Sequence, residues 1–118
     1  MNWSKPCSFD EAQKHLFHST AQSRLRRLAD ELGLAPGSYD LRSEKAGIAV
    51  SGEITLHHEQ AYIQVSQSVI GGGLDVLIRT CAGRRDYQGG HNNFVPLTCF
   101  GDIPALARRV RSIAPGLR

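Results

Sequence analysis

Long apolar runs are missing from this chain of 118 residues. No stretch approaches the roughly 18 consecutive apolar residues of a membrane-spanning helix, so we expect no membrane partner. The first residues, from Met1 to Pro6, also lack the apolar stretch of a secretory signal peptide. We therefore expect a cytoplasmic protein.

Cysteine is scarce as well. The chain has 3 cysteines, Cys7, Cys81 and Cys99, which are widely spaced and form no CxxC pair. An odd number at such spacing argues against a disulfide framework and against a cysteine-rich zinc site. A reducing compartment is consistent with this pattern.

What the chain does contain is typical of a globular protein. Its residues are 41% hydrophobic and 21% charged, which is too apolar for a disordered chain. A chain of this length can bury a core without disulfides or metal. We expect a single domain over residues 1–118, in which residues 1–7 either pack back on the domain or fray.

Charge is unevenly distributed along the sequence. The net charge of +3 divides into +1 for residues 1–36, −3 for residues 37–78 and +5 for residues 79–118. Every basic residue of the last third is an arginine, whose planar guanidinium suits phosphate and carboxylate better than an ammonium does. The sequence thus indicates an anionic partner for the last third, although a solvated surface would have the same composition.

The first part of the chain predicts a helix of roughly 24 residues. Ser8 and Glu11 have capping-box spacing, and Gly33 provides a stop. Ser19 and Gln22 have the same spacing, so two helices in tandem are the alternative. We favour one helix because apolar residues share one face at Phe17, Ala21, Leu25, Leu28 and Leu32.

Four later segments favour strands. Apolar and polar residues alternate from Ile48 to Leu56, and again over residues 61–66. A third strand is expected over residues 74–81, after a turn made by three successive glycines at 71–73. The segment between Phe94 and Phe100 predicts an edge strand or an irregular segment, because Pro96 cannot donate to a ladder.

The end of the chain predicts a second helix. Asp102 is a good N-cap, with Pro104 in the first turn. The predicted fold class is therefore α+β, in the order α-β-β-β-(β)-α. We expect an antiparallel three- to four-stranded sheet with two helices packed on one face, because stacking the apolar faces buries both.

This order of elements resembles that of a double-stranded-RNA-binding domain, a family that grips an RNA helix through phosphate and 2′-hydroxyl contacts. In that family, lysines at the start of the last helix contact phosphates. Here, residues 101–105 at that position contain one acid and no basic residue. The resemblance is confined to the element order.

The segment from Gly83 to Asn93 is the most site-like part of the sequence. It combines arginines, an aromatic residue, a histidine, carboxamides and glycines, a mixture that can clamp phosphate, stack on a base and let backbone N–H groups approach an anion. It has no P-loop motif, and a long turn-rich loop is the alternative. The candidate anion- or partner-binding residues, including the arginines of the last helix, are Arg84, Arg85, Tyr87, His91, Asn92, Arg79, Arg108, Arg109 and Arg111.

Metal binding has little support in the sequence. His15 and His18 are three residues apart on the first predicted helix, but no feature nominates further ligands. His57 and His58 are adjacent, so on a strand they point to opposite faces. We expect His57 on the solvent face, and we expect no metal and no cofactor.

Catalysis is also weakly indicated, so we lean against an enzyme. Cys81 or Cys99 with His91 could form a nucleophile pair, but sequence cannot show contact between them. A buried cysteine more commonly acts as a small apolar residue.

Four segments of the chain resemble small uncharacterised proteins of proteobacteria, some of which are carried on mobile elements. These segments are residues 38–43, 48–56, 83–87 and 92–97. The resemblance covers about half of the chain and implies a bacterial accessory protein, with no residue role to transfer.

Together these observations predict a small non-enzymatic binding module that recognises an anionic partner, either nucleic acid or an acidic protein surface, through the arginine-rich loop and the last helix. One alternative is a protein-interaction or adaptor protein, including a dimer through an edge strand at 94–100. A small Cys/His enzyme is another. The oligomeric state is left open.

Overall fold

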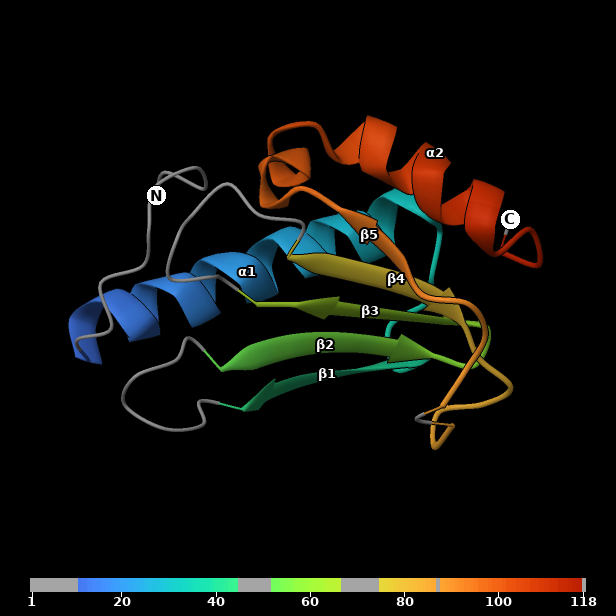
Figure 1. Cartoon of the computed structure of the whole chain (residues 1–118), viewed down its shortest axis with the longest axis horizontal. Helices are drawn as coiled ribbons and strands as arrows, with labels where there is room; N and C mark the ends of the chain where they lie inside the picture. Colours follow the sequence, from blue (N-terminus) through green and yellow to red (C-terminus); the bar gives the residue numbers. More distant parts are fainter. Residues whose placement is uncertain (1–10, 45–51, 67–74, 87, 118) are drawn as a thin grey trace.

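A computed structural model describes residues 11–44, 52–66, 75–86 and 88–117, with side chains from residue 14 onward. Along the chain, a first helix is followed by five strands, one short 3-10 helix and a second helix (Figure 1). The elements are α1 (Glu11–Glu31), β1 (Tyr39–Glu44), β2 (Glu53–His58), β3 (Ala61–Val65), β4 (Val76–Thr80), β5 (Asn93–Val95), η1 (Leu97–Gly101) and α2 (Ile103–Ile113).

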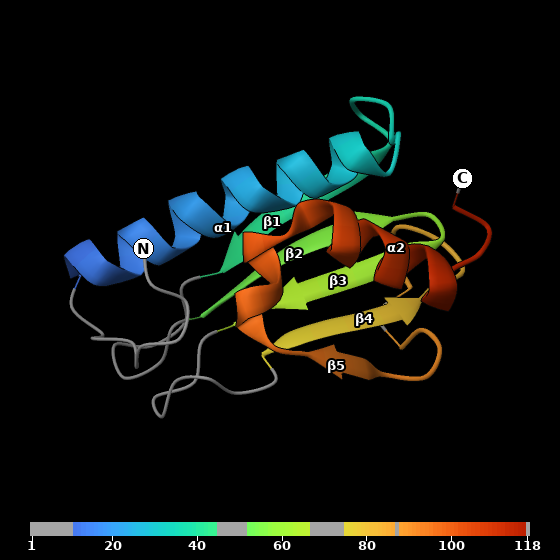
Figure 2. The same ribbon diagram turned by 90° about the horizontal axis from the view of Figure 1, so that it is seen from above.

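The strands form one antiparallel sheet in the order β1-β2-β3-β4-β5. Both helices pack on the same face of this sheet, as Figure 2 shows from the helix side. The predicted α+β class with an antiparallel sheet is therefore confirmed. The predicted number of strands is wrong, because the sheet has five strands rather than three or four.

The additional strand is β1, and its sequence explains why it is easy to miss. Tyr39 and Leu41 pack against the core from one face, whereas charged residues alternate with them on the other. All residues of β1 before Ser43 are only half-buried. Two apolar residues in an edge strand give a weak period-two signal compared with the longer alternation in β2.

The segment between Phe94 and Phe100 also differs from a single strand. Only Asn93–Val95 pairs with β4. Pro96 then caps η1, with an extended backbone at φ −65° and ψ 148°. Since proline has no N–H for the ladder, pairing ends there, and η1 turns Leu97 and Phe100 into the core.

The first helix is a single continuous helix, as favoured over the tandem alternative. Gly33, at φ 72°, ends it. The N–H of Gly33 donates to the Asp30 carbonyl at 3.0 Å, and the N–H of Leu34 donates to the Ala29 carbonyl at 2.9 Å. These two bonds form a Schellman motif. Ser8, the first part of the predicted 48–56 strand and the glycine turn at 71–73 lie outside the described residues.

Asp102 caps α2, as predicted. Its Oδ1 accepts a hydrogen bond from the N–H of Ala105 at 3.1 Å, and a proline occupies the first turn of the helix.

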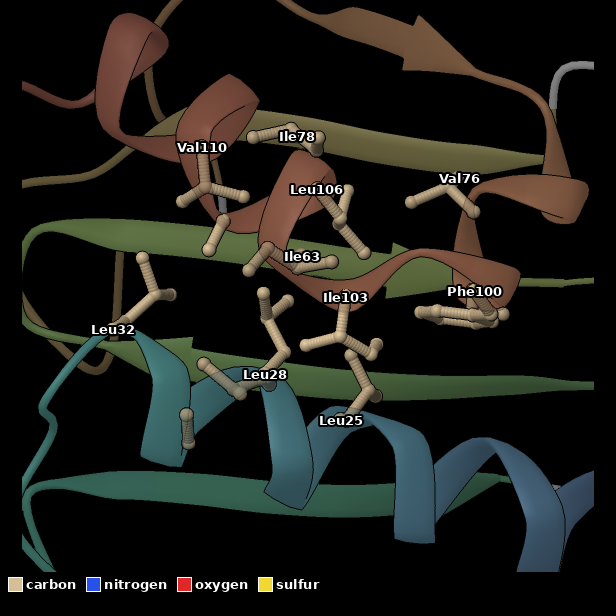
Figure 3. Packing of buried hydrophobic residues seen from close by; sticks show 14 of the residues in the cluster. Leu25, Leu28, Leu32, Ile63, Val76, Ile78, Phe100, Ile103, Leu106 and Val110 are labelled. Atoms are coloured by element: carbon tan, nitrogen blue, oxygen red, sulfur yellow. The ribbon is translucent and has the colours of Figure 1, made fainter.

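One hydrophobic core fills the space between the helices and the sheet. Figure 3 shows side chains from both helices, from η1 and from the strands pointing toward one another, namely Leu25, Leu28, Leu32, Ile63, Val76, Ile78, Phe100, Ile103, Leu106 and Val110. Each fully buried side chain of this size contributes roughly 1.5–3 kcal/mol relative to an exposed one. The core therefore stabilises the sheet from the helix side. The opposite face of the sheet carries the polar residues described next.

Candidate functional site

The sheet face turned away from the helices, called the open face below, carries a polar row. Asp40 pairs with His57, His57 with Tyr62 and Tyr62 with Arg79, so one side chain from each of four neighbouring strands lies at the same level. His57, Tyr62 and Arg79 are nevertheless buried. His57 thus lies on the sheet face away from the core, but the expectation that it is exposed to solvent there is wrong.

His57 is fully buried and has partners on both ring nitrogens. Arg42 Nη2 donates to Nδ1 at 2.7 Å, and Nε2 lies 2.9 Å from the Gly83 carbonyl oxygen, to which it donates. This arrangement assigns the neutral tautomer with its proton on Nε2. Burial lowers the pKa of His57 below its ordinary value, and the nearby arginines add to this effect.

Tyr62 stacks between charged and aromatic neighbours. The Arg79 guanidinium carbon lies 4.1 Å from the centre of the Tyr62 ring, in cation–π geometry. The His57 ring meets the same tyrosine edge-on, with 4.9 Å between centroids. The Tyr62 hydroxyl donates to Gln64 Oε1 at 2.9 Å. His57, Tyr62 and Arg79 thus form a packed polar layer rather than a set of solvated side chains.

The connection between β4 and β5 lies below the sheet in Figure 1, on the open-face side and away from α2. Asp86 organises it. Its carboxylate accepts hydrogen bonds from the N–H groups of Ala82 at 2.9 Å, Gln88 at 3.1 Å and Gly89 at 3.0 Å. These backbone donors lower the pKa of Asp86 to about 2.

Gly89 lets the connection approach the sheet closely. Its φ is +54°, and a Cβ there would lie 2.5 Å from Arg79 Nη1 and 2.6 Å from the Thr80 carbonyl oxygen. Only glycine suits both the backbone conformation and the space. The connection therefore lies tightly against Arg79, which explains why this arginine is buried.

Arg84 is bound within the molecule. Its Nη2 pairs with Asp40 Oδ1 at 2.6 Å, and its Nη1 donates to the Gly37 carbonyl at 3.0 Å. The hydrogen bond from Arg84 is the largest cause of the lowered pKa of Asp40. Arg42 adds a second, longer ion pair to the same carboxylate at 3.4 Å. Arg84 thereby ties the connection to β1.

The other predicted loop residues are more accessible. Arg85, His91 and Asn92 are exposed, while Tyr87 lies outside the described residues. Within residues 81–92, then, Arg85 is the exposed cation and Arg84 is a structural tie.

The predicted arginines of α2 lie on the other side of the sheet (Figure 1). Arg108 and Arg109 are exposed. Arg111 is half-buried, and its Nη2 donates to the Glu31 carbonyl at the end of α1 at 2.8 Å. The structure therefore divides the described candidates into two sets that it does not bring together. The loop set lies in or against the β4–β5 connection and consists of Arg79, Arg84, Arg85, His91 and Asn92; the helix set lies on α2 and consists of Arg108, Arg109 and Arg111 (Figure 1).

Two further arginines belong with the helix set and were not predicted as site residues. Arg26 and Arg27 are exposed on α1, and α1 and α2 lie side by side on the sheet (Figure 2). Their positions between Leu25 and Leu28 already indicate an outward direction in a helix. The sequence could have nominated them, but only the fold shows that the helix carrying them lies next to α2 (Figure 2).

The two described cysteines are poor nucleophiles. Cys81 donates from Sγ to the His58 carbonyl at 3.0 Å, and burial raises its pKa. Cys99 lines an apolar pocket of about 230 Å³ between β5, η1 and α2. Burial raises the pKa of its thiol to about 11. Both thiols are therefore held protonated near neutral pH, which disfavours the Cys/His enzyme alternative.

The histidine pair on α1 divides between two environments. His15 is exposed, whereas His18 is buried and hydrogen-bonds through Nδ1 to the Ser43 hydroxyl. Across the part of the chain that the structure describes, no group of three or more His, Cys, Asp or Glu side chains could hold a metal ion. No helix in that part is long and apolar enough to cross a membrane.

Comparison with protein families, with curated proteins and with solved structures finds no match to this chain. The assignment of function therefore depends on the residues and their geometry.

Proposed function

We propose that this protein binds the phosphate backbone of a nucleic acid through arginines exposed on α1 and α2. The observation that carries the proposal is a set of four exposed guanidinium groups on two adjacent helices, Arg26, Arg27, Arg108 and Arg109. None of the four forms an ion pair with another residue in the described parts of the chain. Unpaired guanidinium groups on one layer suit phosphate recognition.

The local charge balance supports this surface. The helix segment 11–31 carries four basic and three acidic residues, and α2 carries three arginines and no acid. Two arginines join the helices to each other: Arg24 Nε of α1 donates to the Phe100 carbonyl of η1 at 3.0 Å, and Arg111 of α2 donates to the Glu31 carbonyl of α1. Rigid helices joined in this way present the exposed arginines at fixed positions.

The loop set contributes less to such a surface. Arg84 is neutralised by Asp40, and Arg79 is buried against Tyr62. Of the predicted loop cations, Arg85 is the exposed one. The helix layer is therefore the better candidate interface.

The test is the salt dependence of binding to a 20-base-pair DNA duplex and to its RNA counterpart, measured by fluorescence anisotropy. Four phosphate contacts give a slope of about −3 to −4 in log K against log salt concentration. Arg108→Gln should weaken binding and make the slope shallower by about one.

Arg85→Gln is the matched control, since it removes the same charge from an exposed arginine on the opposite side of the sheet. It should leave the affinity and the slope unchanged. A larger loss from Arg85→Gln than from Arg108→Gln would place the contact on the loop and contradict the proposal. Absence of binding to either duplex at low salt would also contradict it, and would favour an acidic protein partner.

Phe94 favours a second candidate, a dimer joined through the β5 edge. Its side chain is 50% exposed on an edge strand, which is unusual for a large aromatic residue. Light scattering across a wide concentration range should then detect a dimer, and Phe94→Ser should shift it toward monomer. A strict monomer at all concentrations would exclude this candidate.

A further inference from the structure

The open face contains a small polar pocket at the end away from the loop set. It has a volume of about 180 Å³ and is lined by Arg42, Glu44, Glu53, Thr55 and Tyr62. On β1 and β2 the pocket lies next to the polar row that begins at Asp40. There Arg42 pairs with Thr55, and Glu44 pairs with Glu53. The pocket is separate from the helix layer, so what it binds is independent of the proposed nucleic-acid surface.

Two carboxylates are placed face to face at the pocket. Glu44 and Glu53 are direct cross-strand partners on the same face of the sheet. Directly opposed side chains have Cβ atoms about 4.5–5.5 Å apart, and like charges at that spacing destabilise a sheet. Neither glutamate forms an ion pair within the described residues. A cation between them would convert this repulsion into attraction.

Thr55 provides an independent sign of a ligand. Its relative exposure is 5%, and it lines the pocket. Its hydroxyl forms no hydrogen bond with any other group in the described structure. A buried polar group without a partner is costly, and such groups are rare in folded proteins. A bound N–H donor would satisfy this oxygen.

Arg42 also lines the pocket, and its guanidinium has partners beside it. Its Nη1 pairs with Asp40 Oδ2 at 3.4 Å and its Nη2 donates to His57 Nδ1 at 2.7 Å. One guanidinium and two carboxylates leave the pocket with a net negative charge. A net charge of −1 matches a monovalent cation, whereas a divalent metal would need more oxygen ligands than this lining provides.

We propose that this pocket binds a primary ammonium group. The ammonium lies between the Glu44 and Glu53 carboxylates, which accept two of its hydrogen bonds, and the Thr55 hydroxyl accepts the third. The Tyr62 side chain forms the aromatic wall beside the alkyl chain. Such a group is carried by a small aliphatic amine or by a lysine side chain.

The first probe is n-butylammonium, with binding measured by isothermal titration calorimetry on the full chain. n-Butanol, which has the same chain and no charge, should not bind. Glu53→Gln keeps the shape but removes one charge, and should weaken binding roughly tenfold. Thr55→Val removes only the hydroxyl and should weaken it by about fivefold to tenfold, while leaving the fold intact.

Glu59→Gln is the matched control, because it removes an exposed acid in the β2–β3 turn outside the pocket. It should leave the affinity unchanged within twofold. Undetectable binding of n-butylammonium, or equal affinities for the wild type and Glu53→Gln, would overturn the proposal. Blocked lysine (N-acetyl-lysine N-methylamide) distinguishes the two sources: if it binds, a lysine side chain is accepted, and if only n-butylammonium binds, the ligand is a free amine.

Discussion

At the scale of single residues, the open face shows how strongly neighbours determine the role of a side chain. Arg84 and Arg85 are adjacent in the sequence, yet Arg84 is bound to Asp40 and Arg85 is exposed. His57 and His58 both have lowered pKa values, but His57 is fully buried with two partners. Residue type alone therefore does not distinguish a structural cation from a contact residue.

The buried His57 predicts an acid-sensitive fold. Burial lowers its pKa in the folded state below the unfolded value of 6.5, so the unfolded chain binds the proton first as the pH falls. The stability that neutral His57 provides is present above that value and is lost as the pH falls through the interval down to the folded pKa. His58 changes the stability in the same direction. The carboxyl groups of Asp40 and Asp86 affect the pH dependence of stability only below about pH 4.

The measurement is the free energy of urea unfolding at a series of pH values from 8 to 4.5. His57→Asn should reduce the loss of stability on acidification, at a cost of about 1–3 kcal/mol at neutral pH from the partners left behind. His58→Asn is the comparison that reports the contribution of the second histidine. An unchanged acid dependence in His57→Asn would refute the assignment.

At the scale of elements, periodicity predicts what local patterns determine. The helices, the N-cap Asp102 and the strands with clear alternation follow from spacing and capping rules. β1 was missed because its two apolar residues are supported by pairing with β2 rather than by local pattern. The contact of Arg84 with Asp40 joins residues 44 positions apart, and no spacing rule predicts it.

The Asp102 cap offers a direct test of one predicted element. Asp102→Ala removes the acceptor for the Ala105 N–H and should lower the free energy of unfolding by about 1 kcal/mol. Asp102→Asn keeps an acceptor oxygen and should be close to wild type. Urea unfolding at neutral pH measures both. Equal losses in the two variants would mean that the charge, and not the hydrogen bond, stabilises this end of α2.

At the scale of the whole molecule, folding rearranges the charge pattern of the sequence. The +5 charge of residues 79–118 is divided by the sheet, with Arg108 and Arg109 on the helix layer and the loop arginines on the open-face side. The acids of residues 37–78 that line the pocket, Glu44 and Glu53, share the open face. A linear count therefore identified a basic segment, but only the fold shows that it contributes to two surfaces.

The same two-sided arrangement predicts that the sheet and the loop at 81–92 open with different free energies. β3 has a hydrogen-bonded strand on each side and core residues beneath it, so its amides should exchange with solvent only through global unfolding. The loop at 81–92 has no flanking strand, and it is held by the hydrogen bonds to Asp86 and by single ties to the sheet such as the Arg84–Asp40 ion pair. Its amides should exchange through a smaller, local opening.

Hydrogen exchange on Asp86→Ala separates these levels. The amides of Ala82, Gln88 and Gly89 lose their acceptor and should exchange faster, while the amides of Ile63 and Gln64 in β3 should slow or quicken only as much as the global stability changes. Because the Asp86 carboxylate accepts its three hydrogen bonds from loop N–H groups, an effect on β3 beyond the global change would show that the loop and the sheet open as one unit. In that case the polar row beneath the loop would be part of the cooperative core rather than a layer added to it.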